Sequence, residues 1–195
     1  IHPLTTYSIT YEDQDKYFQA YDYQTTMDDD YIQEMLSRYP TYHHKIILKQ
    51  EDLLNALEES LIARDMPGMA DIDSSFLLFA KEISKNHKVS LSGECADEIF
   101  GGYPWFYKEE LYTQPYFPWM RDLDQKIDLF NDKVKALDLE HYIKQRYQES
   151  LLEIPTTDTK KQMIYLNIQW FMQTLLARAD SQTMRSSLEV RVPFA

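Results

Sequence analysis

Several residue types are scarce in this chain of 195 residues, and each scarcity excludes a class of protein. A single cysteine cannot build an internal disulfide framework, which is typical of a protein in a reducing compartment. No apolar run approaches the roughly eighteen residues of a membrane-spanning helix, and we see no signal-peptide pattern. Basic residues number 20 against 32 acidic ones, whereas a nucleic-acid-binding surface needs clustered lysine and arginine. We therefore expect a cytoplasmic protein with no nucleic-acid or membrane partner.

Glycine is also scarce, and its distribution is uneven. Only four glycines are present, and three of them, Gly93, Gly101 and Gly102, fall within the run LSGECADEIFGGY at residues 91–103. Glycine allows a backbone to approach a bound ligand closely. Because the run follows the apolar segment 89–91, it predicts a strand that ends at a ligand-binding turn.

The same run holds three carboxylates, Glu94, Asp97 and Glu98. This spacing would place all three on one face of a helix. Crowded carboxylates repel one another unless a cation or a basic group joins them, so the cluster indicates a metal or substrate site. A solvated acidic helix start is the alternative interpretation, because acidic residues stabilise helix N-termini.

Strands and helices are predicted to alternate in the first half of the chain. β-rich segments predict strands at 6–11, 44–48 and 88–91. Amphipathic patterns predict helices at 29–39, 51–63 and 76–83. Ser74 or Ser75 is expected to cap the last of these helices. Strands joined through helices form parallel sheets, and ligands bind beyond the carboxyl ends of such strands. That rule places residues 92–97 at a site and residues 9–11 near it.

The second half is predicted to be mainly helical. Residues 103–119 form an aromatic, proline-containing connection, which we interpret as a loop packed under neighbouring helices. Apolar periodicity predicts helices at 122–136, 139–152 and 160–184. The last is apolar over most of its circumference, so we expect a central buried helix. We expect one domain, 1–195, with an α/β part at 1–103 and a helical part at 104–195.

The run at residues 91–103 resembles the signature of the synthetase domain of glutamine-dependent asparagine synthetases. A second segment, LEVRVPF at residues 188–194, is similar to another motif of that family, and RAD at residues 178–180 resembles the segment before it. The similarity covers nearly the whole chain. The resemblance implies an α/β fold with a three-layer parallel sheet of the adenine-nucleotide alpha-hydrolase-like type, followed by a mainly helical C-terminal half.

The resemblance also implies an activity, that of an ATP-dependent amide-forming ligase. The family activates the aspartate β-carboxylate with ATP, releases pyrophosphate, and lets ammonia attack the β-aspartyl-AMP intermediate. ATP and Mg²⁺ are the implied cofactors. Aspartate, ATP and ammonia from glutamine are the implied substrates, and a glutaminase domain of the same parent chain is the implied partner.

Single residues receive roles from the same resemblance. Ile9, Ser92 and Gly93 match positions that contact ATP, and Asp97 matches the acid that holds Mg²⁺. Mg²⁺ usually takes one or two carboxylates together with phosphate oxygens and water. Glu94 matches a catalytic acid tied to forming the adenylate and handling the amine, and removal of a proton from ammonium is a physically sensible role for it.

Three further residues are candidate contacts to substrate or phosphate. Asp71 follows the second crossover helix, where the family has an acidic loop that faces aspartate. Arg178 and Asp180 match family positions near the site, and Arg178 could face an α-carboxylate or a phosphate. Both could instead only pair with nearby charges. Glu189 and Arg191 could likewise form a structural ion pair.

The chain also departs from the family pattern. It lacks the pyrophosphate loop Ser-Gly-Gly-x-Asp-Ser, the downstream catalytic lysine, and the N-terminal cysteine that hydrolyses glutamine. We therefore expect this polypeptide alone to be inactive, and we expect a Ser-Gly-Gly-x-Asp-Ser-like segment upstream in the parent protein. Ser181 and Ser187 replace a common arginine and glycine. Cys95 stands where glycine is usual, and we interpret it as a packing residue, not a nucleophile.

Two alternative functions stay open from the sequence. A related carboxylate-adenylating enzyme, such as an amidotransferase or one similar to β-lactam synthetase, would use the same scaffold with another acid. A non-enzymatic acidic helical module would instead dock protein partners through the aromatic rings of residues 103–119. Burial of those rings inside the fold would count against docking.

Overall fold

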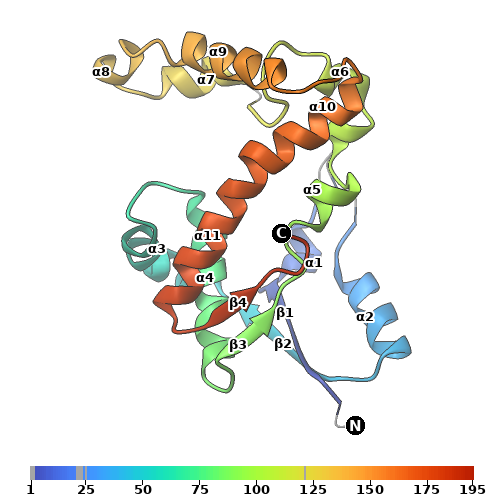
Figure 1. Cartoon of the computed structure of the whole chain (residues 1–195). Coiled ribbons are helices and arrows are strands. Elements are labelled where there is room, and N and C mark those ends of the chain that lie inside the picture. The colour runs from blue at the N-terminus through green and yellow to red at the C-terminus, as the bar shows by residue number, and fades with distance from the viewer. Residues whose placement is uncertain (1–2, 21–23, 25, 121) are drawn as a thin grey trace. The chain divides into compact units, whose positions relative to one another are not determined.

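The computed structural model describes residues 3–20, 24, 26–120 and 122–195 (Figure 1). Contacts divide the chain into two compact units, and each is described by itself. The first unit comprises Ile1–Gly93 with Leu175–Pro193, and the second comprises Glu94–Thr174 with Phe194–Ala195. Among the helices of the described residues, none combines the length and the hydropathy that a bilayer crossing requires.

The first unit contains short parallel strands and the helices that pack against them. Its strands are β1 (Thr5–Tyr11), β2 (Tyr42–Leu48), β3 (Val89–Leu91) and β4 (Glu189–Arg191). Its helices are α1 (Gln14–Tyr17), α2 (Asp29–Arg38), α3 (Gln50–Arg64), α4 (Ala70–Ser84) and the C-terminal part of α11 (Met172–Arg185). β-branched and aromatic side chains dominate β1, which has the sequence TTYSITY, and this composition favours a half-buried strand.

The strands pair as two separate parallel sheets. β1 lies beside β2 with Thr6 opposite His43, and β3 lies beside β4 with Ser90 opposite Val190. The strand–helix pattern predicted parallel strands and the resemblance implied one sheet in a three-layer fold, but no ladder joins the two pairs among the described residues. Parallel strands with a helical majority make this a mixed α/β fold.

The start of α4 differs from the sequence prediction, which placed its cap at Ser74 or Ser75. The helix begins about one turn earlier, at Ala70, and Ser74 Oγ donates to the Ala70 carbonyl oxygen from inside the helix (2.6 Å). Ser75 is buried and its Oγ accepts a hydrogen bond from the Tyr11 hydroxyl (2.9 Å). The two serines therefore satisfy their hydroxyls within the helix and against β1, so neither is available as a cap.

Helix α4 supports both sheets of the first unit. Ala80 and Ile83 of α4 form a buried cluster with Leu188, which directly precedes β4. Tyr7 of β1 and Val190 of β4 pack against this cluster. One helix face thus contacts strands that lie far apart in the sequence, and the burial of these apolar groups holds the strands in place.

A buried ion pair closes the turn between α3 and α4. Arg64 Nη1 lies 3.2 Å from Asp73 Oδ2, and only 4% of the Asp73 side chain is exposed. Gly68 lies directly over this pair, because a Cβ atom there would sit 2.0 Å from Asp73 Oδ2. The backbone at position 68 therefore approaches the ion pair so closely that only glycine, which has no Cβ atom, fits there.

The second unit is helical in its described part. Its helices are α5 (Ala96–Phe100), η1 (Pro104–Phe106), α6 (Glu109–Tyr112), α7 (Leu123–Asp128), α8 (Asp132–Lys135), α9 (Leu139–Leu152), α10 (Thr159–Leu166), the π-helical η2 (Asn167–Phe171) and the first residues of α11. The prediction for 139–152 is confirmed by α9. The helix predicted at 122–136 is wrong as one element, because Asn131 interrupts it and caps α8 by accepting the Val134 amide (3.2 Å).

The aromatic connection is packed inside the second unit. Trp105 is 2% exposed, its ring stacks on Tyr103, and its Nε1 donates to Asn167 Oδ1 (3.2 Å). Phe117 belongs to a buried cluster with Tyr147 and with apolar residues of α10. The prediction of a packed loop is therefore confirmed at Trp105 and Phe117, and their burial counts against docking through these two rings, whereas Tyr107 is 62% exposed.

The long C-terminal helix is less buried than predicted. α10, η2 and α11 follow one another without a break and cover the predicted range 160–184. Ile164 and Ile168 remain 38% and 39% exposed, and Met184 is 60% exposed. The prediction of a central buried helix is therefore wrong at these exposed apolar positions.

Candidate functional site

The two sequence motifs meet as paired strands. β3 carries the start of LSGECADEIFGGY and β4 lies within LEVRVPF, so segments about a hundred residues apart in sequence form one parallel ladder. The ladder continues past its last pair, because the Ser92 amide donates to the Arg191 carbonyl oxygen (3.0 Å). β4 therefore fixes the end of the strand from which Ser92 and Gly93 emerge.

Strand β4 was not predicted from the sequence. The signal was present, since apolar Val190 alternates with the charged Glu189 and Arg191 in the manner of a half-buried strand. The two charged side chains form an exposed ion pair, with Arg191 Nε 2.8 Å from Glu189 Oε1. The structure thus shows the ion pair that the sequence left as one of two interpretations.

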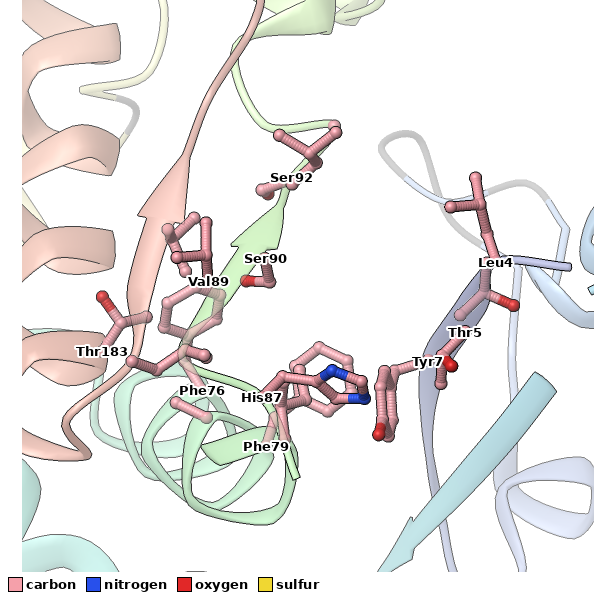
Figure 2. Close-up of a pocket in the computed structure, with 17 residues that line it drawn as sticks. Leu4, Thr5, Tyr7, Phe76, Phe79, His87, Val89, Ser90, Ser92 and Thr183 are labelled. Atoms are coloured by element: carbon pink, nitrogen blue, oxygen red, sulfur yellow. The ribbon is translucent and has the colours of Figure 1, made fainter. Parts of the chain in front are cut away.

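A cavity of about 510 Å³ opens between β1 and the β3–β4 pair (Figure 2). Ser92 and Gly93 line it at the carboxyl end of β3. Its other walls are mainly apolar and come from β1, α4, β3, α11 and β4 and from residues next to these elements: Leu4, Thr5, Thr6, Tyr7, Phe76, Phe79, Ala80, Ile83, His87, Val89, Ser90, Leu91, Thr183, Leu188 and Val190. Ser92 and Gly93 therefore lie where the strand-end rule predicts a ligand, whereas Thr5, Thr6 and Tyr7 line the cavity from the amino end of β1.

Gly93 differs from the other three glycines in what surrounds it. A Cβ atom at Gly93 would meet nothing within 4 Å, and its φ lies outside the left-handed region. A Cβ at Gly68 or Gly102 would clash, and Gly101 has a φ of +74°. The fold itself therefore gives no reason for glycine at position 93, and a ligand that approaches this backbone closely would supply one.

The structure does not bring Ile9 into the same cavity. Ile9 lies in β1 opposite Ile46 and lines a second cavity of about 550 Å³. The lining of this second cavity is rich in acidic side chains and also includes Lys45. Of the three candidate ATP contacts, only Ser92 and Gly93 thus share a cavity.

The remaining candidates of the first unit occupy α4 and α11. The guanidinium carbon of Arg178 lies 5.8 Å from the centroid of the Phe76 ring, and Phe76 lines the first cavity. Arg178 therefore places a positive charge beside the cavity wall. Asp180 is exposed. Asp71 lies in the first turn of α4 and not in the predicted loop, and its side chain is outside the described part of the chain.

The acidic residues of the second unit are not on one helix face. Cys95 has a φ of +69°, so α5 begins only at Ala96 and Glu94 precedes the helix. Asp97 is exposed, whereas Glu98 is 1% exposed and accepts a hydrogen bond from the Tyr103 hydroxyl (2.6 Å). The left-handed residue thus separates the three carboxylates that the sequence pattern grouped. Among the described residues, no three acidic, histidine or cysteine side chains are grouped so that they could hold a metal ion.

Comparison with known proteins decides the family. The profile of the family described as Asparagine synthase matches residues 2–195. The chain belongs to the asparagine synthase family.

It is 49% identical over 201 residues to glutamine-hydrolysing asparagine synthetase 3 of Bacillus subtilis, covering 99% of this chain and 32% of that protein. Asparagine synthetase 1 of the same organism is 28% identical over 187 residues, covering 76% of this chain and 29% of that protein. A plant relative, asparagine synthetase 3 of Arabidopsis thaliana, is 38% identical over 71 residues, covering 35% of this chain and 12% of that protein. The chain thus spans about a third, or less, of the length of these relatives.

Cys95 has the properties of a packing residue in this member of the asparagine synthase family. Its side chain is 2% exposed. Burial, followed by the charges of Glu98 and Glu94, raises the pKa of the Cys95 thiol to about 11. A raised pKa favours the neutral thiol over the thiolate that a nucleophilic cysteine needs, which agrees with a packing role.

The resemblance seen in the sequence implies a magnesium ion, and Asp97 is the residue that would hold it. Asp97 offers an exposed carboxylate, and Mg²⁺ bound to a nucleotide needs only one or two carboxylates because phosphate oxygens and water complete its shell.

Proposed function

We propose that the chain is the synthetase part of a longer, glutamine-hydrolysing asparagine synthetase, and that its two units act as one domain. In this proposal an oxygen of the aspartate β-carboxylate attacks the α-phosphorus of ATP. A phosphorus–oxygen bond forms, the bond to pyrophosphate breaks, and β-aspartyl-AMP results. Ammonia from glutamine, supplied by the glutaminase domain, then attacks the acyl carbon and AMP leaves. This polypeptide alone is proposed to be inactive, because it lacks the pyrophosphate loop.

One observation carries the proposal. The two family motifs form a single ladder that aims Ser92 and Gly93 at a cavity, and Gly93 there has open space where other residues have a side chain. A nucleotide is the ligand that the family uses, and close backbone contact with it would account for the glycine. Arg178 beside the cavity wall adds a positive charge suited to a phosphate or a carboxylate.

The residues of the second unit supply the remaining roles in this proposal. Asp97 would hold Mg²⁺ through its exposed carboxylate. The ion, when bound, would neutralise charge on the departing pyrophosphate. Glu94, which is partly buried, would accept a proton from ammonium and release the nucleophilic amine. Ile9, Asp71 and Asp180 remain proposed contacts to nucleotide or substrate on the strength of the family match alone.

We further propose that the two strand pairs belong to one parallel sheet of a three-layer fold in the longer protein. The facing edges of β1 and β3 have no strand partner in the described chain, and an apolar cavity lies between them (Figure 2). One more parallel strand would pair with both edges and occupy the apolar part of the cavity, which leaves the end at Ser92 and Gly93 open for the nucleotide. Parallel sheets are normally buried on both faces, which the apolar lining fits.

The proposal is tested by ATP–pyrophosphate exchange in the full-length protein. Aspartate should support exchange and other carboxylic acids should not. Asp97→Asn should reduce the exchange rate about 100-fold or more, because the metal-bound phosphates lose their protein ligand, while the melting temperature stays unchanged since Asp97 is exposed. Near-normal exchange by Asp97→Asn would overturn the metal role. Exchange with another acid and none with aspartate would instead show a related ligase or a β-lactam-forming enzyme.

A further inference from the structure

The pair Gly101–Gly102 directly follows α5, and the proposed function gives these two glycines no role. Gly101 and Gly102 belong to the strongest family motif, and glycine pairs are commonly associated with phosphate binding. Helix α5 has only five residues, and the pair lies at its C-terminal end, where carbonyl groups and not amides are unsatisfied. The pair is therefore poorly placed to bind phosphate. Its role lies in the turn that it forms at the end of α5.

The two glycines turn the chain back over Asp97. The amides of Gly101 and Gly102 both donate to the Asp97 carbonyl oxygen, each at 2.9 Å. Gly101 adopts the left-handed conformation, with a φ of +74°, which is the usual way to end a helix. A Cβ at Gly101 would be 3.5 Å from the Phe106 ring, an ordinary contact. Gly101 is thus required for its backbone conformation alone.

Gly102 is required for a different reason. A Cβ atom at this position would lie 1.9 Å from Asp97 Oδ1, 2.7 Å from its Cγ and 3.0 Å from its Cβ. The whole side chain of Asp97 therefore occupies the space that any other residue at 102 would need. An aspartate side chain has two rotatable bonds, so it could escape this clash only by moving its carboxylate to another rotamer.

We propose that Gly102 is a positioning residue for the Asp97 carboxylate. The turn anchors the backbone of Asp97 through two hydrogen bonds. Because Gly102 has no Cβ atom, the Asp97 side chain has room to adopt its observed rotamer. The carboxylate stays exposed in this arrangement, so a metal ion with its phosphate ligands can reach it. This inference rests on the proposed function for the identity of the metal, but the rotamer control follows from the geometry.

A comparison of Gly102→Ala with Gly101→Ala separates positioning from stability. Both variants should lower the melting temperature of the full-length protein, Gly101→Ala by about 3–5 °C because alanine resists the left-handed conformation. Only Gly102→Ala should weaken Mn²⁺ binding in the presence of ATP, by about ten-fold as measured by electron paramagnetic resonance. Equal Mn²⁺ affinity in Gly102→Ala and the unchanged protein would overturn the proposal, and so would equal weakening in both variants.

A thermodynamic cycle tests the same geometry without any metal. Gly102→Ala should lower the melting temperature by about 3–8 °C in the unchanged background and by much less in an Asp97→Ala background, where the clashing carboxylate is gone. If Gly102→Ala fails to fold, recovery of folding in the double variant supports the proposal. Equal effects in both backgrounds contradict it. Absence of Mg²⁺-dependent exchange in the unchanged protein would refute the proposed function, while this cycle would still decide the role of Gly102.

Discussion

The four glycines differ in the structural reason for having no side chain. Gly68 admits the Arg64–Asp73 ion pair, Gly101 adopts a left-handed conformation, and Gly102 admits the Asp97 carboxylate. Gly93 meets none of these demands, since its missing Cβ faces open space. The sequence shows where the glycines are, but it does not show why glycine is needed at each position. The reasons depend on neighbours brought close by folding.

This distinction leads to a prediction for Gly93. Gly93→Ala should leave the melting temperature within about 2 °C of the unchanged protein, because the new methyl group meets no atom and the backbone is unstrained. ATP affinity, measured by isothermal titration calorimetry on the full-length protein, should fall about ten-fold or more if the nucleotide lies against this backbone. Gly101→Ala is the matched control, with lowered stability and retained affinity. Unchanged affinity in Gly93→Ala would place the nucleotide elsewhere.

Among the elements, the helices agree with the sequence better than the sheets do. Amphipathic helices such as α3 and α9 follow from local periodicity, and their ranges lie within a residue or two of the prediction. The start of α4 could not be predicted from Ser74 and Ser75, because whether a serine caps a helix or is buried within it depends on tertiary packing. Strand β4, with three residues, is too short for a periodic pattern to stand out.

Helices α3, α4 and α11 also share a carboxylate that makes their association depend on pH. Glu59 of α3 pairs with Lys81 of α4 and with Arg185 of α11, the latter at 3.3 Å. The hydrogen bond from Lys81, followed by the charges of Lys81 and Arg185, lowers the pKa of the Glu59 carboxyl below 4.5. A lowered carboxyl pKa contributes stability that is complete above the unfolded-state pKa and is lost as pH falls through the folded-state pKa.

We therefore expect Glu59→Gln to lower the free energy of unfolding at pH 7 by up to about 1 kcal/mol, a modest value because about a third of the side chain is exposed. The difference should disappear as the pH falls below 4.5. Urea denaturation at a series of pH values measures this. Glu153→Gln is a suitable control outside the three helices, because its partner is the Tyr165 hydroxyl and not a cation. A deficit of equal size at pH 3 and pH 7 would contradict the electrostatic explanation.

At the scale of the whole molecule, the first unit is completed by the end of the chain. Leu188 is 1% exposed and packs with Ala80 and Ile83, although about a hundred residues separate them in sequence. β4 then pairs with β3 and fixes the strand end that carries Ser92. The candidate site of the first unit therefore depends on residues from both ends of its sequence.

Leu188→Ala should accordingly destabilise the first unit by about 2–4 kcal/mol through a cavity in its core. Hydrogen exchange resolved by peptide should show the loss of protection in residues 3–20, 26–93 and 175–193. Leu152→Ala is the matched control, since that leucine is 88% exposed and its truncation should change stability by less than about 0.5 kcal/mol. Similar effects of the two truncations would show that Leu188 does not hold the unit together.

Local information in the chain was enough for helices such as α2, α3 and α9, the first three strands, the packed aromatic connection and the two motifs that indicate the family. Periodicity, turn residues and short-range spacing encode these features, because they depend only on near neighbours. Folding alone decided that β4 pairs with β3, that the left-handed Cys95 separates Glu94 from the acids of α5, and that Gly102 lies over Asp97. Each of these depends on backbone conformation or on a partner distant in sequence, and neither can be read from the spacing of residue types.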